Sequence, residues 1–581
     1  MLKILARSIR EYKRPAILSP ILISGEVVLE CLIPMKIADL VTEIEKGCDL
    51  GVILRYGGVL VVMALLSLTF GLLAGLTCAT AACGFGKNLR RDMFFSIQDF
   101  SFANIDKFST SSLVTRLTTD VMNVQHSFMM LIRTAIRSPF MLVFSFVMAF
   151  RMGGRMAGIF FFVIPVLGTG LFVIMRKTMP LFRKVFKKYD ALNSSIQENI
   201  NGIRVVKSFV REDHESEKFG VAAEDVCRDF TRAERILAFN GPIMQFCMYC
   251  VMIFVMIFGS YVVISTTGTD LTVGQMSALL TYNVMMLSSL MMLSMIFVML
   301  TMSAESAKRI AEVITEKSTL TSPENALTEV TDGSIKFDGV SFKYSEKAEK
   351  MALADIDLEI ASGETVGIIG GTGSSKTTLI QLISRLYDAT EGVVKVGGRD
   401  VREYDLEVLR NNVAVVLQKN ILFSGTVKDN LRWGNKDATD EEMIEACRLS
   451  HADEFVSSFP GGYDYYIEQA GANLSGGQKQ RLCIARALLK KPKILILDDS
   501  TSAVDTRTDA MIRRAMKTYI PETTKIIIAQ RTASVEDADK IIIMDGGRIS
   551  AIGTHSELLA SNEVYREIYT SQNKAGGEEN E

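Results

Sequence analysis

The sequence predicts two different domains, a bundle of membrane-spanning helices followed by a cytosolic α/β domain with a parallel sheet. Six apolar segments lie in the first half, each close to the ~20 residues that a helix needs to cross a bilayer: 16–40, 56–84, 136–151, 156–176, 241–266 and 276–302. The hydrophobic content of 48% and mean hydropathy of +0.23 are high for a soluble protein. In the second half, a Gly-rich loop follows one short apolar run and an acid pair follows another. This arrangement is typical of the carboxyl ends of parallel strands.

Charge and cysteine content exclude two other classes of protein. The net charge is −2, so nothing indicates a nucleic-acid partner. The nine cysteines are scattered, several of them within apolar helices, and do not form a disulfide framework. Cys247 and Cys250 form a C-x-x-C pattern without partner ligands, which favours two small core residues one helical turn apart over a metal or redox site.

The loops between the apolar segments predict the topology. The loops 85–135 and 177–240 are long and rich in Lys and Arg, whereas 41–55 and 267–275 are short and mildly acidic. The positive-inside rule therefore places the N-terminus and both long loops in the cytoplasm. The apolar spacing in both long loops indicates helical arms.

Glu26 and Glu30 are four residues apart and share one face of the first span. Ionisable groups inside a membrane are costly and usually face a cavity or a partner. Two interpretations have equal weight: the pair binds a cationic substrate, or it forms a structural pair with Arg133 or Arg137.

A polar stretch divides the two domains. We expect a transmembrane domain over 1–315, a linker over 316–334, an α/β domain over 335–571 and a disordered Gly/Glu-rich tail over 572–581. The alternation that starts at Ile335 and Phe337 predicts an edge strand.

A phosphate-binding loop follows the apolar run 365–369 and opens a helix. Its backbone amides and the helix N-terminus are suited to phosphate oxygens. Lys376 would reach the β- and γ-phosphates, and the Thr377 hydroxyl would bind Mg²⁺. The loop consists of Gly370, Gly371, Thr372, Gly373, Ser374, Ser375, Lys376, Thr377 and Thr378.

A second cluster of motifs spans 474–505. It starts with a turn, Leu474-Ser475-Gly476-Gly477-Gln478, and continues as a helical run. The apolar run 494–497 then ends in Asp498 and Asp499, which predicts a central parallel strand with an acid pair at its carboxyl end.

These motifs resemble those of the ATP-binding-cassette (ABC) ATPases. The turn resembles their signature motif, the acid-ended strand their Walker B motif, and 502–505 (Ser-Ala-Val-Asp) their D-loop. Six spans with two cytoplasmic arms resemble the transmembrane half of ABC exporters of the type IV, multidrug type. In that family, short helices at the tips of the arms touch the ATPase domains, here expected near 109–112 and 201–208.

The resemblance implies a role for each matching residue. Two chains would sandwich ATP, so each site is composite. This chain would supply to its own site Tyr344 for adenine stacking, Lys376, Asp499 and Gln530 for catalysis, and Thr377, Gln418 and Asp498 for Mg²⁺. It would supply Ser475, Gly476, Gly477 and Gln478 to the partner's site.

The sequence departs from the family's pattern at three positions. Ser375 replaces the usual Gly before the Lys, Asp499 the catalytic Glu, and Gln530 the switch His. The last two resemble the degenerate site of heterodimeric exporters, which binds ATP and hydrolyses it slowly. We therefore expect an exporter of amphipathic drugs, lipids or peptides in the cell membrane, acting with a different half-transporter that carries the catalytic Glu and the switch His. The alternatives are a nucleotide-gated regulatory or channel-type ABC protein and a homodimeric exporter.

Overall fold

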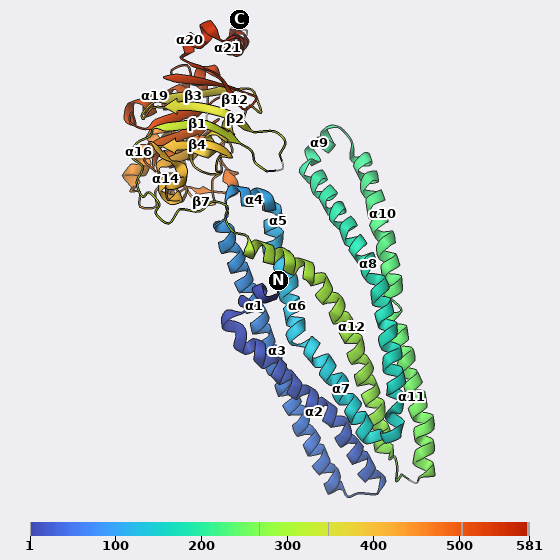
Figure 1. Ribbon diagram of the computed structural model, residues 1–581. Helices are drawn as coiled ribbons and strands as arrows, with labels where there is room; N and C mark the ends of the chain where they lie inside the picture. Colours follow the sequence, from blue (N-terminus) through green and yellow to red (C-terminus); the bar gives the residue numbers. More distant parts are fainter. Residues whose placement is uncertain (1, 267, 347, 501–502, 578–581) are drawn as a thin grey trace. The chain divides into compact units, whose positions relative to one another are not determined.

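The computed structural model describes residues 2–577 apart from 267, 347 and 501–502 (Figure 1). The chain divides into two compact units. The helical unit contains 1–98 and 109–316, and the α/β unit contains 99–108 and 317–581. The short segment 99–108 thus belongs to the α/β unit, although helices of the helical unit precede and follow it.

The helical unit consists of long helices with short connections. Five stretches within the described residues are long and apolar enough to cross a membrane: Arg10–Glu45, Leu50–Gln98, Thr110–Val185, Glu212–Ser265 and Val273–Thr315. The helices in chain order are α1 (Leu2–Arg7), η1 (Arg10–Tyr12), α2 (Lys13–Glu45), α3 (Leu50–Gln98), α5 (Thr110–Thr115), the π-helix η2 (Arg116–Asp120), α6 (Val121–Ile132), α7 (Thr134–Gly153), η3 (Gly154–Ile159), α8 (Phe160–Asn201), α9 (Ile203–Ser208), α10 (Glu212–Leu237), α11 (Asn240–Ser265) and α12 (Val273–Thr315).

The stretch Thr110–Val185 contains two of the predicted spans. The chain turns between α7 and α8 through the 3-10 segment η3, where Gly154 has φ 47°, a left-handed conformation that glycine adopts at little cost. The predicted segments 136–151 and 156–176 therefore lie mostly on different helices.

Apolar side chains point both into and out of the helical unit. Its core includes Val27 of α2, Phe160 of α8 and Tyr282 of α12, all fully buried. The helix α3 instead exposes large apolar side chains such as Leu54, Leu65 and Leu68. A helix that is apolar on its outer face is suited to lipid contact.

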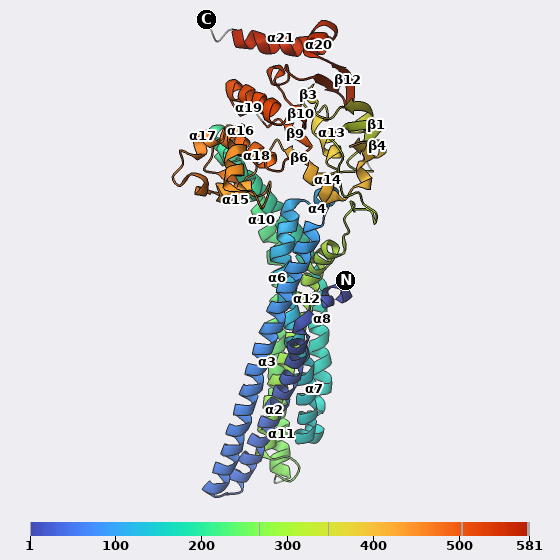
Figure 2. The same ribbon diagram turned by 90° about the vertical axis from the view of Figure 1, so that its left-hand side faces the viewer.

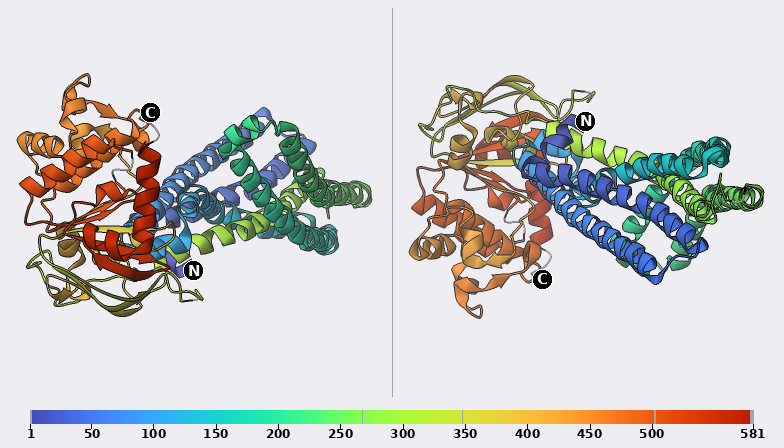
Figure 3. Two further views of the ribbon diagram at one scale, coloured as in Figure 1. Left: turned by 90° about the horizontal axis from the view of Figure 1, so that it is seen from above. Right: turned by 90° about the horizontal axis from the view of Figure 1, so that it is seen from below.

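The second of the two long arms that the sequence predicts, 177–240, contains a pair of adjacent helices, the end of α8 and α10 (Figures 1 and 3). Lys188 of α8 lies 2.8 Å from a carboxylate oxygen of Asp229, and the Phe182 ring packs edge-on against Phe230. The helix α9, at the tip of this pair, falls within the second expected contact segment.

The α/β unit contains two main sheets (Figure 2). The six-stranded sheet has the order β12-β11-β3-β10-β9-β6, in which β11, β3, β10, β9 and β6 are parallel. The four-stranded sheet, β2-β1-β4-β5, is antiparallel. The strands are β1 (Ile335–Phe342), β2 (Leu353–Ile360), β3 (Thr365–Gly370), β4 (Glu391–Val396), β5 (Arg399–Asp400), β6 (Val413–Val416), β7 (Gly425–Thr426), β8 (Tyr466–Ile467), β9 (Ile494–Asp498), β10 (Thr524–Ile528), β11 (Lys540–Asp545) and β12 (Arg548–Gly553).

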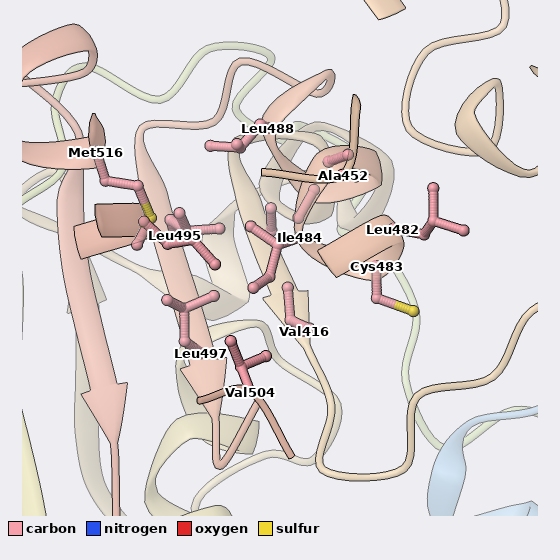
Figure 4. Packing of buried hydrophobic residues seen from close by; sticks show 14 of the residues in the cluster. Val416, Ala452, Leu482, Cys483, Ile484, Leu488, Leu495, Leu497, Val504 and Met516 are labelled. Atoms are coloured by element: carbon pink, nitrogen blue, oxygen red, sulfur yellow. The ribbon is translucent and has the colours of Figure 1, made fainter. Parts of the chain in front are cut away.

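Helices cover the parallel sheet and form a continuous core with it. Figure 4 shows Ile484 and Leu488 of α18 packed near Leu495 and Leu497 of β9. All five residues of β9 are buried, as the apolar run predicts for a central parallel strand. The helices of this unit are α4 (Phe102–Phe108), α13 (Lys376–Ile383), α14 (Leu406–Asn412), α15 (Val427–Leu431), α16 (Asp440–Leu449), α17 (Asp453–Val456), α18 (Gly476–Leu488), α19 (Thr506–Tyr519), α20 (His555–Ser561) and α21 (Glu563–Gly577), with short 3-10 turns between them.

Two expectations need correction. First, β1 is not an edge strand, because it pairs with both β2 and β4; alternation marks one solvated face, which interior antiparallel strands also have. Second, the arm segment within the α/β unit is α4, whereas 109–112 belongs to the helical unit. The helix α21 continues to Gly577, and a disordered tail over 572–581 stays a prediction. Of the D-loop motif, Ser502 lies outside the described residues.

Candidate nucleotide-binding site

The loop between β3 and α13 has the backbone geometry of a phosphate-binding loop. Gly370 ends β3, where a side chain would collide with the Met544 carbonyl oxygen, 2.2 Å from the ideal Cβ position. Ser375 has φ 70° and ψ 25°, the left-handed region. A non-glycine residue held there costs about 1–2 kcal/mol, which is the physical reason for the usual Gly at this position.

The Lys376 ammonium folds back over this loop. Its Nζ donates to the carbonyl oxygens of Gly370 at 2.7 Å and Gly371 at 2.9 Å, and to Ser374 Oγ at 3.2 Å. Burial is the main cause that lowers the pKa of Lys376, and the carboxylates of Asp498 and Asp499 partly oppose it. The three hydrogen bonds hold the Lys376 side chain at the mouth of the loop, where phosphate recognition places a lysine.

Thr377 and Asp498 form the candidate magnesium centre. The Thr377 hydroxyl donates to Asp498 Oδ2 at 3.0 Å. Asp498 ends β9, and burial raises the pKa of its carboxyl. A hydroxyl and a carboxylate from neighbouring elements are the hard oxygen donors that Mg²⁺ prefers, so these residues fit the metal. A Mg²⁺ ion held by these residues would neutralise the negative charge of the phosphates during γ-phosphate transfer.

Asp499, Gln418 and Gln530 meet around one carboxylate oxygen. Gln530 Nε2 donates to Asp499 Oδ2 at 2.7 Å, and Gln418 Nε2 lies 3.5 Å from the same oxygen. The Asp499 backbone has φ 49° and donates its N–H to the Ile528 carbonyl on the neighbouring strand. The short carboxylate is thus fixed from both its backbone and its side chain.

An aromatic cluster lies beside the phosphate-binding loop and α13. Tyr344 is half exposed, and its hydroxyl bonds Thr378 Oγ1 at 2.9 Å and Gln381 Oε1 at 3.1 Å. Burial of the hydroxyl raises the pKa of Tyr344. Its ring meets Tyr387 edge-on, with centroids 5.3 Å apart. A half-exposed ring next to the loop offers a face on which a base could stack.

Tyr387 connects this cluster to α4. Its hydroxyl donates to Asp106 Oδ2 at 2.7 Å, and its ring lies 6.1 Å from that of Phe102. Buried Asn104 fastens the same segment, because its side chain bonds the Lys317 carbonyl at 3.1 Å and the Thr319 amide at 3.2 Å. Sequence reasoning missed these residues, which lie far from the motifs along the chain.

The signature turn is a capped helix N-terminus. Ser475 Oγ accepts from the Gln478 amide at 3.3 Å, and Gln478 Oε1 accepts from the Ser475 amide at 2.9 Å. In this capping box, the Gln478 side chain stabilises the start of the helix. A Cβ on Gly477 would lie 2.9 Å from the Ala503 carbonyl, so only glycine fits without a backbone shift. Gly476 and Gly477 leave the helix N-terminus open to an anion.

The acids of the first span lie against an arginine. Arg137 Nη1 donates to Glu26 Oε1 at 2.6 Å, and Arg137 Nη2 donates to both oxygens of Glu30 at 2.8 and 2.7 Å. Glu26 is 8% exposed, and its Oε2 has no hydrogen-bond partner among the described residues. Of the two arginines considered from the sequence, Arg137 is the partner of both carboxylates.

Most predicted residues of this chain's own site therefore lie at the carboxyl ends of β3, β9 and β10 and at the start of α13. Gln418, which follows β6, and Tyr344, which follows β1, reach this group through their side chains. The fold and these contacts define a P-loop nucleotide-binding domain. Among the described residues of the same chain, five apolar helical stretches precede it.

Comparisons with known proteins identify the family. The model of the ABC transporter transmembrane region matches residues 17–291, and the ABC transporter model matches 353–502. The chain is 34% identical over 564 residues, 97% of each chain, to the "Uncharacterized ABC transporter ATP-binding protein YfiB" of Bacillus subtilis (strain 168). It is 36% identical over 414 residues, 70% of each chain, to the "Putative multidrug export ATP-binding/permease protein YgaD" of the same organism.

The fold agrees with a solved structure. A bacterial Atm1-family ABC exporter with ATP bound superposes with a TM-score of 0.81 at 24% identity, covering 97% of this chain and 98% of that chain. This chain belongs to the ABC transporter family. It is a multi-pass membrane protein with the ABC exporter fold and an ATPase domain coupled to transport.

Proposed function

We propose that this chain is one half of a heterodimeric ABC exporter, and that its own nucleotide site binds ATP with Mg²⁺ but hydrolyses it slowly. The observation that carries the proposal is the 2.7 Å bond from Gln530 Nε2 to Asp499 Oδ2. A general base must accept a proton from the attacking water, and here one carboxylate oxygen already accepts from an amide. Gln530 itself carries neither a proton for transfer nor a positive charge.

The geometry of the signature turn supports the proposal that the partner is a different chain and not a second copy of this one. Its capping box and its close approach to Ala503 keep the helix N-terminus ordered and open. Such a turn completes a hydrolytic site when the opposite chain carries the catalytic Glu and the switch His. Two identical chains would instead form two impaired sites.

Export is the direction that we propose for transport. The relative named as a multidrug export protein and the exporter fold support it. We further propose six spans in the cell membrane, because α7 and α8 are separate helices within one apolar stretch. The Lys- and Arg-rich N-terminus and arms would then be cytoplasmic, together with the ATPase domain.

The experiment compares ATP hydrolysis by the purified chain alone with hydrolysis by the chain paired with a candidate partner half-transporter in lipid nanodiscs. We expect low turnover alone and much higher turnover in the pair. Equal turnover by the chain alone would favour the homodimeric exporter. Nucleotide-dependent ion conductance without substrate transport would favour the channel-type alternative.

For the substrate, we propose that Glu26 and Glu30 bind a cationic group of an amphipathic molecule. Glu26 Oε2 is buried without a partner among the described residues, and Arg137 offsets only one of the two carboxylate charges. Transport of ethidium by Glu26→Gln should fall, with basal ATP hydrolysis and expression kept. If the variant loses expression and thermal stability instead, the cluster is a structural ion pair.

A further inference from the structure

The C-terminal helix α21 is firmly attached to the ATPase domain. Tyr565 is fully buried, and its hydroxyl lies 2.7 Å from His555 Nδ1. Ile568 packs against the same core. Tyr565, Ile568 and Gln572 are spaced by three and four residues, so they share one helix face. The anchored face therefore carries Gln572 to the body of the domain.

Gln572 holds the backbone on both sides of Arg531. Its Nε2 donates to the Gln530 carbonyl at 2.8 Å. Its Oε1 accepts from the Thr532 amide at 2.9 Å and from the Thr532 hydroxyl at 3.0 Å. The nitrogen and the oxygen of this one side-chain amide thus both hydrogen-bond the loop that follows β10.

This loop carries the residue at the switch position. Gln530 is fixed through its backbone by Gln572 and through its side chain by Asp499. On the sheet side, the preceding Ala529 donates its N–H to the Ile368 carbonyl at 3.3 Å. Gln572 therefore holds the Gln530 main chain from the side of α21, in addition to the contacts of the strand that precedes it.

We propose that Gln572 is a positioning residue, which holds Gln530 over the nucleotide so that ATP stays long at this chain's own site. The inference rests on the proposed function, in which ATP remains at this site between cycles. Gln530 compensates for the missing switch His only if its amide points at the γ-phosphate end of the site. If the loop were mobile, the Gln530 amide would hydrogen-bond water instead of the γ-phosphate, and ATP would dissociate faster.

The test uses the assembled heterodimer and three variants. Gln572→Leu keeps the size and helix propensity but removes all three bonds. Gln572→Glu keeps the two accepting bonds and loses the donated one. Ser571→Ala is the matched control on the neighbouring, exposed position. In every sample the partner's P-loop Lys is replaced by Ala, so that radiolabelled ATP reports on this chain's site.

Two readouts are needed. Hydrogen exchange of the peptide that contains Thr532 tests the geometry, and dissociation of labelled ATP tests the role. In Gln572→Leu we expect both to be about tenfold faster, because each readout depends on one of the lost hydrogen bonds: exchange on the Thr532 amide bond and ATP release on the Gln530 carbonyl bond. Gln572→Glu should release ATP at an intermediate rate but keep the slow exchange at Thr532, whose amide bond it retains, and Ser571→Ala should match wild type.

The outcomes separate the inference from the proposed function. If exchange at Thr532 accelerates in Gln572→Leu while ATP dissociation stays unchanged in both Gln572 variants, the positioning role is refuted although slow ATP release stands. Rapid ATP release by the wild type refutes the proposed function itself. If Gln572→Leu only lowers the melting temperature and Gln572→Glu releases ATP like wild type, α21 is a structural helix and the inference fails.

Discussion

Lengthening the carboxylate at position 499 should restore hydrolysis at this chain's own site. Asp499→Glu adds one methylene, which advances the carboxylate by about 1.5 Å. The backbone should stay in place, because the Asp499 N–H bonds the Ile528 carbonyl at 3.0 Å. The longer side chain also moves the carboxylate oxygen away from its present position beside Gln530 Nε2.

The size of the gain follows from this geometry. A catalytic group misplaced by about 1 Å costs on the order of a hundredfold in rate, which corresponds to about 2.7 kcal/mol of activation free energy. We therefore expect up to about a hundredfold faster hydrolysis at this site. Gln530→His, added to the first substitution, should increase the rate again, since His supplies a proton and a charge.

The assay measures phosphate release by the heterodimer after the partner's catalytic Glu is replaced by Gln, so that only this chain's site hydrolyses. Asp499→Gln is the matched control, with the length of Glu but no base. If Asp499→Glu releases phosphate no faster than Asp499→Gln, the length of the side chain does not limit hydrolysis and the reasoning is wrong.

Three further predictions concern other contacts. Tyr387→Phe removes the bond to Asp106, so we expect α4 to be held about 1–1.5 kcal/mol more weakly and substrate-stimulated ATP hydrolysis to fall with basal hydrolysis kept; unchanged stimulation would show that this bond does not transmit. Gly477→Ala places a Cβ 2.9 Å from the Ala503 carbonyl, and the forced shift should slow turnover of the heterodimer about tenfold or more, with the melting temperature as the control. Arg137→Met leaves two carboxylates without their cation and should destabilise the helical unit by about 3–5 kcal/mol, measured by thermal unfolding in nanodiscs; a normal melting temperature would show that the two carboxylates do not need Arg137 as their counter-charge.

The parts of the site that the sequence predicted are the contiguous ones. The phosphate-binding loop follows one apolar run, and the acid pair follows another. Each motif can be recognised within about ten residues, because its strand, turn and helix follow each other directly along the chain. The structure brings Thr377 and Asp498 into contact although 121 positions separate them. Parallel pairing places the carboxyl ends of β3, β10 and β9 at one edge, so this contact follows once the strands are recognised.

Other features depend on contacts that local patterns do not record. Asp106 meets Tyr387 across 281 positions, and Asn104 meets Lys317 across 213. Neither pair belongs to a periodic pattern, so the placement of α4 in the α/β unit was missed. The same holds at the C-terminus, where the contacts of Gln572 with Gln530 and Thr532 join residues about 40 positions apart.

The asymmetry of the two nucleotide sites is the central claim, and two single substitutions test it most directly. Steady-state ATP hydrolysis and nucleotide occupancy are measured in the heterodimer carrying either Asp499→Asn or Ser475→Arg. We expect Asp499→Asn to change turnover little, because it alters a carboxylate that is already short and hydrogen-bonded to an amide. Ser475→Arg should abolish most turnover, since it removes the helix cap and places bulk and charge against the partner's nucleotide, while ATP remains bound at this chain's P-loop. If Asp499→Asn stops hydrolysis as completely as Ser475→Arg, Asp499 is a working general base and the account is wrong.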